Sequence, residues 1–393
     1  MSCCFCLCNM STNKNLLPML QSKKERTWKF RFTREVNMKR RWTILALSLA
    51  LVFAMGGCKK EEKKEEKPKD LVINVKKEEP EDLGAKNLLS GLPGLSEEAV
   101  GKRPVAVMVN NVEHAMPQYG IEEADIIFEI PVEGDLTRFM VLYGDYTKIP
   151  KVCAVRSCRS YFPTLSEGYD AFYVNWGVDE TIRDYLNSLH LDQFDGMTFG
   201  QGLFGRDQDR LNSGYASEHT AYFDGTKFRE IAEKDYRTDL DDEHNKPAFV
   251  FNEEEEMITP AGDACNRVDI NFGAQTSAFD FDAEKKVYKK EMNGHPQIDA
   301  NTDKQLEFTN VFIIETSITI RDETGHKDIE CMGGDGSTAY YISNGAVQQV
   351  HWKKDGGTAR SRLIFFDDSG NEITVNPGKT YIGVSYPGKE SFQ

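Results

Sequence analysis

The sequence predicts an α+β protein, with a mixed α/β domain followed by a β-rich domain. Over residues 101–245, continuous apolar runs of strand length are interleaved with a segment of helical periodicity. After Pro247 the pattern changes to short alternating runs separated by Asn-Gly, Asp-Gly and Pro-Gly turns, which are typical of hairpins. The 393 residues are enough for two such domains and a targeting segment.

A signal peptide that ends on a cysteine precedes the predicted domains. Met38 is followed by three basic residues, the apolar run Ile44–Met55 and two glycines that directly precede Cys58. This order is typical of an export signal, and the apolar run is too short to span a bilayer comfortably. We expect translation to begin at Met38; the alternative is a start at Met1 with a longer basic segment.

The segment around Cys58 resembles the lipobox of bacterial lipoprotein precursors, in which a Leu and two small residues precede a lipidated cysteine. Met55 stands where Leu is usual, and Gly56 and Gly57 fit the pattern. The resemblance implies that Cys58 is acylated, as by palmitate, and holds the protein at the outer face of the cytoplasmic membrane. Two or three acyl chains contribute about 0.8 kcal/mol per buried CH₂, enough for stable anchoring. The alternative is an ordinary signal peptide followed by an incidental cysteine.

The chain after the signal peptide is strongly acidic. Ten Lys and Arg residues and two Glu residues lie before residue 58, which leaves 38 basic and 61 acidic residues, a net charge of −23, after it. This excludes a nucleic-acid binder, which needs a basic face. Residues 59–70 read KKEEKKEEKPKD, with no apolar face, and are typical of a solvated spacer. The predicted parts are an upstream extension (1–37), a signal peptide (38–57), a charged spacer (58–100), the α/β domain (101–245) and the β-rich domain (246–393).

The first domain is predicted from five apolar runs, each of which is typical of a buried strand. The runs are Val105–Val109, Ile126–Ile130, Phe139–Tyr143, Val152–Val155 and Ala171–Val174. A helix is predicted over residues 179–189, because Ile182, Leu186 and Leu189 recur on one face.

The second domain is predicted from shorter runs bounded by turns. The runs are Ala248–Phe251, Val268–Phe272, Val311–Thr319, Ala339–Ile342, Gln348–Trp352, Arg362–Phe366 and Tyr381–Val384. Four cysteines are scattered over the two domains, and an exported protein permits Cys153 to pair with Cys158 or Cys265 with Cys331; spacing does not decide whether either bond forms.

Both predicted domains resemble a family of uncharacterised bacterial lipoproteins, the YerB-like family, which is defined by a domain of unknown function. The motifs that carry the resemblance are RPVAVMVNN (103–111), the turn from Pro117 to Gly120, ADIIFEIPVEGDLTRF (124–139), AVRSCRSYF (154–162), YDAFYVNWG (169–177), SEH (217–219), NGAVQQVHWKK (344–354) and NPGKTYIGV (376–384). The resemblance implies a surface lipoprotein with an α/β domain and a β-rich domain. It implies no established reaction.

Polar side chains gather where the predicted strands end, which is where open α/β sheets place their sites. Arg156 and Arg159 lie in a strand-to-helix loop, with Ser160 as the expected helix cap, and are suited to a phosphate, sulfate or carboxylate. The alternative is a structural ion-pair network with Glu129, Glu133 or Asp170. The sequence leaves both readings open.

Three further candidates flank a short turn. Glu129 and Glu133 are suited to act as a paired acid and base, and Arg138 follows them. The alternative is that a Glu inside an apolar run serves to satisfy a nearby Arg.

Asn110 and Asn111 follow the first strand and can donate and accept hydrogen bonds there, although turn formation alone explains them. His219 is suited to act as a general base held by Glu218, or is an ordinary hydrogen-bonded loop residue. No cofactor or metal motif is complete, and we expect neither.

Two functions fit these candidates. The first is a binding or scaffold lipoprotein of the cell envelope, with a cell-wall polymer or a wall-synthesis protein as its partner. The alternative is a hydrolase or transferase acting on a phosphorylated or acidic envelope substrate. In that case Arg156 and Arg159 hold the anion, Glu129 or Glu133 acts as acid or base, and His219 assists.

Overall fold

The computed structural model describes residues 84–200 and 202–393. The predicted extension, the signal peptide, Cys58 and most of the spacer lie outside the described residues. Both predicted domains fall within one unit of the chain, Glu78–Gln393. None of the helices in the described part of the chain has the length and apolar character needed to cross a bilayer.

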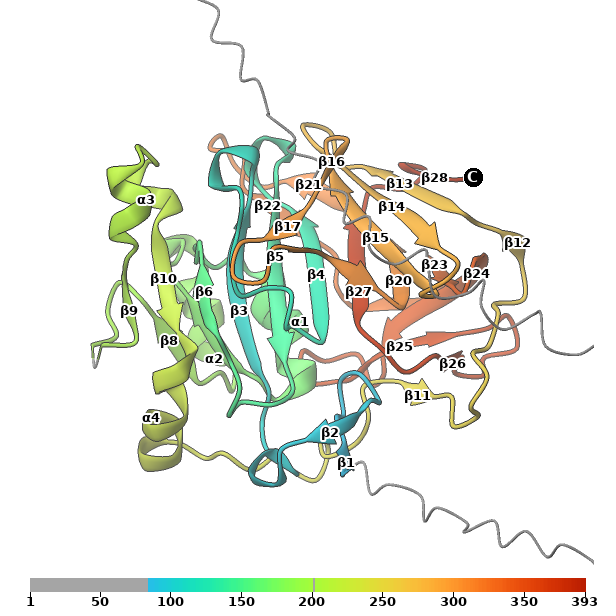
Figure 1. The fold of residues 1–393 in the computed structure, drawn as a ribbon, viewed down its shortest axis with the longest axis horizontal. Helices are drawn as coiled ribbons and strands as arrows, with labels where there is room; N and C mark the ends of the chain where they lie inside the picture. The colour runs from blue at the N-terminus through green and yellow to red at the C-terminus, as the bar shows by residue number, and fades with distance from the viewer. Residues whose placement is uncertain (1–83, 201) are drawn as a thin grey trace, which may run out of the picture. The chain divides into compact units, whose positions relative to one another are not determined.

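We call the part of the described chain up to residue 245 the first half and the part from residue 246 the second half. An eleven-stranded sheet takes strands from both halves, and Figure 1 shows the teal strands β4 and β5 beside the red strand β27. The order is β12-β24-β23-β20-β27-β4-β5-β3-β7-β8, with β25 paired to β24. Its strands are β3 (Val105–Asn111), β4 (Ile126–Pro131), β5 (Thr137–Tyr143), β7 (Phe172–Asn175), β8 (Gln193–Asp195), β12 (Asp263–Ala264), β20 (Asn310–Glu315), β23 (Gly333–Ser343), β24 (Ala346–Lys354), β25 (Leu363–Phe366) and β27 (Thr380–Ser385). The halves join where β27 runs parallel to β4, with Tyr381 beside Ile127.

Two smaller sheets complete the main β structure. A three-stranded sheet in the first half has the order β6-β10-β9, and a six-stranded sheet in the second half has the order β16-β15-β14-β13-β28, with β19 paired to β15. Their strands are β6 (Lys151–Cys153), β9 (Phe204–Arg206), β10 (Ala221–Asp224), β13 (Arg267–Asn271), β14 (Thr276–Asp282), β15 (Val287–Met292), β16 (His295–Pro296), β19 (Glu307–Phe308) and β28 (Glu390–Phe392). Two-stranded pairs are β1 (Ala85–Lys86) with β2 (Pro93–Leu95), β11 (Val250–Phe251) with β26 (Thr374–Val375), β17 (Ile298–Asp299) with β18 (Lys304–Gln305), and β21 (Ile318–Ile320) with β22 (Lys327–Ile329).

The helices are short. They are α1 (Tyr161–Ser166), α2 (Arg183–Ser188), α3 (Gln208–Asn212) and α4 (Phe228–Asp235), with 3-10 turns η1 (Glu97–Ala99), η2 (Glu113–Ala115), η3 (Glu133–Asp135), η4 (Glu167–Tyr169), η5 (Glu180–Ile182), η6 (Ser217–His219) and η7 (Gly225–Lys227). The amphipathic segment 179–189 is therefore a 3-10 turn followed by a short α-helix. The high strand content confirms an α+β fold with a β-rich second half.

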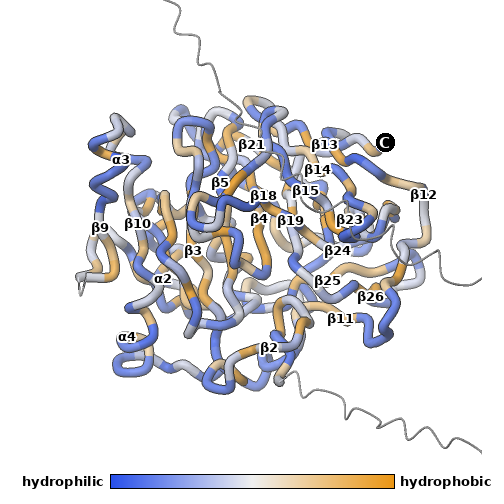
Figure 2. The backbone as a smooth tube through the Cα atoms, in the orientation of Figure 1, coloured by the Kyte–Doolittle hydropathy of each residue, from blue (hydrophilic) through white to orange (hydrophobic). Residues whose placement is uncertain are grey.

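The central strands are mostly apolar because both faces of the sheet are covered. In β3, Val105, Val107 and Val109 pack into one core with Phe223 and Phe279. Ala106 and Met108 point to the opposite face and pack into a second core with Tyr161, Phe312 and Trp352. Figure 2 shows the hydrophobic colour along β3 and β4.

The five apolar runs predicted in the first half are all strands, although β6 stops at Cys153 and Val155 forms only an isolated bridge with Val109. The run predicted over residues 311–319 is broken into β20 and β21. Strands β14 and β15 were not predicted. The boundary at residues 245/246 stays a prediction; the strands on its two sides share the central sheet.

The four described cysteines, Cys153, Cys158, Cys265 and Cys331, are buried free thiols. Burial raises the pKa of Cys153 to about 11 and that of Cys158 to about 12. Neither thiol is therefore ionised near neutral pH, so neither offers a reactive thiolate.

Candidate functional site

Five of the eight candidate residues line one cavity of about 420 Å³, which we call the site cavity. They are Asn110 at the end of β3, Glu133 in η3, Arg138 in β5, Arg156 in the loop after β6, and His219 in η6. The second half of the chain supplies Ala274, Gln275, Met292 and Asn293 to the lining. Asn111, Glu129 and Arg159 are not part of that lining. The cavity therefore lies where strand ends of the first half meet the six-stranded sheet.

The guanidinium group of Arg159 forms an ion pair with Glu133. Its Nε donates to Glu133 Oε1 at 2.5 Å and its Nη2 donates to Glu133 Oε2 at 3.0 Å. Arg138 Nη2 lies 3.8 Å from the same carboxylate, and its Nη1 donates to the carbonyl oxygen of Ser157 at 2.8 Å. Burial raises the pKa of Glu133, but the hydrogen bonds and charge of Arg159 and the charge of Arg138 outweigh it, so the net shift is downward. Glu133 is thus held as a carboxylate, which suits it poorly as a proton donor.

Arg156 makes a hydrogen bond through only one of its guanidinium nitrogens in the described part of the chain. Its Nη1 donates to the carbonyl oxygen of Glu218 at 3.3 Å and lies 3.6 Å from Glu218 Oε2. Its Nε is buried and has no hydrogen-bond partner among the described residues. Ser160 stands at the N-cap of α1, as predicted, but its side chain makes no capping hydrogen bond. Arg156 therefore has unused hydrogen-bonding capacity within the described part of the chain.

His219 is held between Asn110 and Glu218. Its Nδ1 lies 2.9 Å from the Asn110 amide nitrogen, which donates to it, and its Nε2 lies 3.4 Å from Glu218 Oε1. These partners place the ring proton on Nε2. Burial lowers the pKa of His219 below its usual value, which the charge of Glu218 opposes and the charge of Arg156 reinforces. His219 is therefore neutral at neutral pH, with its basic nitrogen already in a hydrogen bond.

Glu129 lies behind the cavity wall in a buried polar network. Glu129 and Lys290 of β15 are both 0% exposed, and Lys290 Nζ lies 3.2 Å from Glu129 Oε2. The Glu129 carboxylate also accepts hydrogen bonds from Asn111 Nδ2 at 2.8 Å, Thr137 Oγ1 at 2.7 Å, Ser277 Oγ at 2.8 Å and the Tyr381 hydroxyl at 2.8 Å. Burial lowers the pKa of Lys290, and Glu129 opposes that shift. The Glu inside the apolar run thus meets a lysine from the other half of the chain, where an arginine was expected.

The network leaves two glutamine carbonyl groups without a partner. Gln275 Nε2 donates to Thr137 Oγ1 at 2.5 Å, and the Thr137 hydroxyl donates in turn to Glu129. Gln297 Nε2 donates to Asn111 Oδ1 at 2.8 Å. Because Glu129 can only accept, the donors face it, and Oε1 of Gln275 and of Gln297 lies on the side away from the network. Both oxygen atoms are buried and lack a partner among the described residues.

A glycine lets the second half approach this site. Gly273 has φ of 111°, and a Cβ atom there would lie 2.7 Å from the Cβ atom of Asp135 in η3. A side chain at this position would therefore push the loop away from η3. The close approach places Gln275, two residues later, against Thr137.

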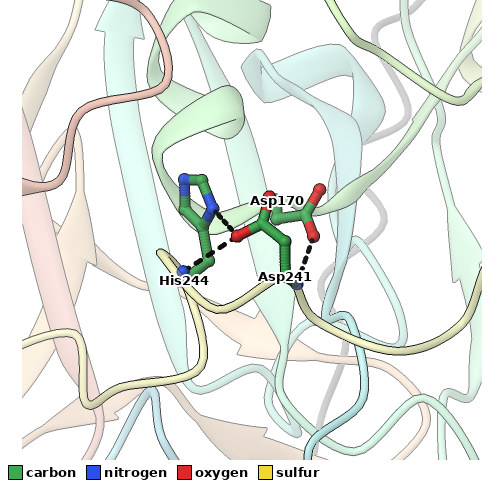
Figure 3. A group of neighbouring side chains, drawn as sticks. All are labelled: Asp170, Asp241 and His244. Carbon is green, nitrogen blue, oxygen red and sulfur yellow. Dashed lines mark hydrogen bonds and ion pairs between the residues drawn. The ribbon is translucent and has the colours of Figure 1, made fainter.

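Asp170, Asp241 and His244 form a separate cluster of the kind that can hold a metal ion, since one ligand atom from each lies within 4.8 Å of the others. Figure 3 shows His244 turned toward Asp241, whose Oδ1 lies 2.6 Å from His244 Nδ1. Arg237 donates to both carboxylate oxygens of Asp170, at 2.7 and 2.8 Å, and His244 Nε2 lies 2.8 Å from the carbonyl oxygen of Arg360. Arginine and backbone groups thus already engage these ligand atoms, and we describe the cluster as an ion-pair network.

Three of the residues that build the site were not among the predicted candidates: Gln275, Lys290 and Gln297. Each lies in the second half, far along the chain from the strand ends it meets. Buried and partly exposed residues alternate along β15, and Lys290 shares the buried face with Tyr288 and Met292. Its place in this alternation was the one sign that Lys290 lies inside the protein. A buried lysine needs a counter-charge buried with it, because an unpaired charge inside a protein is costly.

Comparison with known proteins finds matches over most of the described chain. The family described as "Protein of unknown function (DUF3048) N-terminal domain" matches residues 89–238, and the corresponding C-terminal domain matches residues 268–382. The chain is 32% identical over 307 residues to "Putative lipoprotein YerB" of Bacillus subtilis (strain 168), which spans 76% of this chain and 87% of that protein. The crystal structure of the YerB protein from Bacillus subtilis has a TM-score of 0.66 at 27% identity, covering 79% of this chain and 100% of that one.

The buried ion pair gives a stability prediction. Glu129→Gln is expected to lower the free energy of unfolding by about 3–5 kcal/mol, because it leaves the Lys290 ammonium buried without a counter-charge. The double variant Glu129→Gln, Lys290→Met removes both charges and is expected to recover most of the loss. Urea unfolding of the three proteins measures both effects. A Glu129→Gln protein as stable as the parent would contradict the assignment.

The environment of His219 gives a titration prediction. Because burial lowers its pKa, the unfolded chain binds this proton more readily than the folded chain. The lowered pKa of His219 therefore adds its full contribution to the free energy of unfolding above about pH 6.5, the usual histidine pKa. That contribution is lost as the pH falls below this value. NMR titration should give a midpoint below 6.5, with the resonance assigned through a His219→Asn variant. Glu218→Gln should move the midpoint lower still, and a midpoint above 6.5 would be inconsistent with the structure.

Proposed function

The chain belongs to the YerB-like family of DUF3048 proteins, and from that premise we propose that it is a lipid-anchored envelope protein that binds a ligand in the site cavity. In this proposal Cys58 holds the protein at the outer face of the cytoplasmic membrane. Residues 59–83, which make up most of the predicted spacer, lie between that anchor and the described residues. The ligand is an envelope component, either a cell-wall polymer or a wall-synthesis protein.

The signal sequence and a similar protein both support the anchor. The order of basic residues, apolar run and Gly-Gly-Cys around Cys58 fits a lipoprotein signal. The relative from Bacillus subtilis bears the name of a putative lipoprotein. A tethered position also suits an acidic chain, which would not rest on an anionic surface without an anchor.

The observation that carries binding is a cavity whose lining brings charged residues of the first half, among them Arg138 and Arg156, together with polar residues of the second half. Arg156 Nε and Gln275 Oε1 belong to lining residues and have no partner among the described residues. Both atoms are buried, so leaving each unsatisfied costs about 1–3 kcal/mol in the folded protein. Residues from both halves of the chain build the lining, so the cavity depends on how the halves pack.

The same geometry favours binding over catalysis. Glu133 is held as a carboxylate by Arg159, and Glu129 lies behind the wall with Lys290. His219 is neutral, and its basic nitrogen accepts a hydrogen bond from Asn110. The acid and base that a hydrolase or transferase needs are thus engaged by other protein groups.

The anchor is tested by replacing the cysteine. Cys58→Ala is expected to release the protein from the membrane fraction into the medium, because the acyl chains are lost. Mass spectrometry of the parent protein should find a mature N-terminus at residue 58 that carries acyl groups. An unmodified thiol at Cys58 in membrane-associated protein would contradict the anchor.

Binding is tested by photo-crosslinking in living cells. A photoreactive amino acid at Asn293, an exposed residue of the lining, should give a discrete adduct, whereas the same group at Glu255, exposed and outside the lining, should not. Arg156→Gln should weaken the adduct. Equal labelling at both positions would contradict ligand binding in the site cavity. A captured molecule that the purified protein then converts chemically would favour the hydrolase or transferase instead.

A further inference from the structure

Arg138 is a buried arginine on the lining of the site cavity, with 4% of its surface exposed. Among the described residues it makes one hydrogen bond, from Nη1 to the carbonyl oxygen of Ser157 at 2.8 Å. The carboxylate beside it belongs to Glu133, whose Oε2 lies 3.8 Å from Arg138 Nη2, beyond hydrogen-bond distance. A buried guanidinium group usually has its donors satisfied and its charge paired. Arg138 therefore carries a charge that the described residues compensate only in part.

Glu133 cannot supply the missing compensation, because Arg159 engages both of its carboxylate oxygens, at 2.5 and 3.0 Å. Burial lowers the pKa of Arg138 to about 10, the positive charges of Arg159 and Arg156 lower it further, and Glu133 opposes the shift. Arg138 is still charged at neutral pH. A surplus of positive charge is therefore present inside the cavity wall.

The free donors of the two lining arginines are accessible from the cavity. Nε and Nη2 of Arg138 make no hydrogen bond with a described residue, and neither is among the buried atoms that lack a partner, so both keep contact with solvent. The same holds for Nη2 of Arg156, whose Nε is buried. Both side chains line the site cavity. A ligand there has access to three unused donor atoms.

The two arginines flank the end of β3. Arg138 lies opposite Asn110 on β5, and on the other side of β3 the backbone nitrogen of Arg156 donates to the carbonyl oxygen of Met108 at 3.0 Å. Backbones on either side of one strand lie about 10 Å apart, which long side chains can bridge. The guanidinium group of Arg138 does so, since it reaches the carbonyl oxygen of Ser157, the residue after Arg156. Both guanidinium groups can therefore contact one small ligand group.

The charges around the cavity favour a ligand group with a single negative charge. Arg138, Arg156 and Arg159 meet two carboxylates, those of Glu133 and Glu218, which leaves one positive charge over. Glu218 is 58% exposed, so solvent screens its charge. A doubly charged group would be repelled by both carboxylates.

The other titratable side chains of the lining do not change this balance. His219 is neutral at neutral pH, and Glu113 and His114 are exposed to solvent. The lining also has an apolar part, made by Val112, Val132, Leu136 and Met292. The cavity thus suits a charged group that is attached to an organic body.

We propose that the site cavity binds its ligand through a singly charged oxyanion, a carboxylate or a phosphodiester group, held by Arg138 and Arg156 over the end of β3. The oxygen atoms of this group accept hydrogen bonds from the free arginine donors. Arg159, which the sequence placed in this role beside Arg156, is engaged by Glu133. The inference rests on the proposed function and names the chemical group that the cavity recognises.

The test uses saturation-transfer difference NMR with the purified full-length protein at constant ionic strength. The probes are acetate and dimethyl phosphate, which are singly charged, and their neutral counterparts acetamide and trimethyl phosphate. At least one anion is expected to bind about tenfold or more tightly than its neutral counterpart, because charge-assisted hydrogen bonds are lost with the charge. Preference for acetate would identify a carboxylate ligand, and preference for dimethyl phosphate a phosphodiester.

Matched variants locate the anion. Arg138→Gln and Arg156→Gln are each expected to weaken binding of the preferred anion about tenfold. Glu218→Gln removes the carboxylate that competes for Arg156 and is expected to strengthen binding about two- to fivefold. If Arg138→Gln does not fold, the opposite effects of the other two variants still decide the question. Arg183→Gln removes an exposed charge outside the lining and should change nothing.

Three outcomes would overturn the inference. The first is that neither anion binds more tightly than its neutral counterpart. The second is an equal loss for Arg183→Gln, which would indicate attraction to surface charge alone. The third is weaker binding to Glu218→Gln than to the parent protein. If any of these occurs while the group at Asn293 still gives its photo-crosslinked adduct, ligand binding in the cavity stands and the oxyanion assignment falls.

Discussion

The packing of the two halves depends on one buried ion pair, Glu129 with Lys290. Glu129 lies in the central sheet, on β4, and Lys290 lies in the six-stranded sheet, on β15. Neither side chain is exposed to solvent, so each charge has to be compensated within the protein. Three aromatic rings, those of Phe139, Phe279 and Tyr381, lie 5.5 to 5.8 Å from the Lys290 ammonium and add a favourable electrostatic surface. Separating the two side chains while both stay buried would leave each charge without its counter-charge.

The same pair orders the polar groups around it. A carboxylate only accepts hydrogen bonds, so the amide and hydroxyl groups near Glu129 turn their donors toward it. Asn111 and Thr137 donate to it directly, and Gln275 and Gln297 donate to those two residues. As a consequence, the carbonyl oxygens of the two glutamines are buried without a partner among the described residues. In this account Glu129 shapes the site without touching a ligand.

Much of the first half could be predicted from local pattern, because continuous apolar runs such as residues 105–109 mark strands covered on both faces. The clustering of Asn110, Arg138 and Arg156 also follows from their positions at strand ends. The junction could not be predicted. The pairing of β27 with β4 joins segments about 250 residues apart, and β14 and β15 carry charged residues that interrupt their apolar alternation. Lys290 is the clearest case, because the Glu129 carboxylate beside it is what explains why a lysine is buried there.

Neutron diffraction from a crystal of the protein exchanged into deuterium oxide tests this account most directly, because it locates the amide hydrogens of Gln275 and Gln297. The account predicts deuterium-bearing amide nitrogens that face Thr137 and Asn111, with the carbonyl oxygens turned away from these two residues. Amide nitrogens turned away from Thr137 and Asn111, or a Lys290 side chain without its third deuteron, would contradict it.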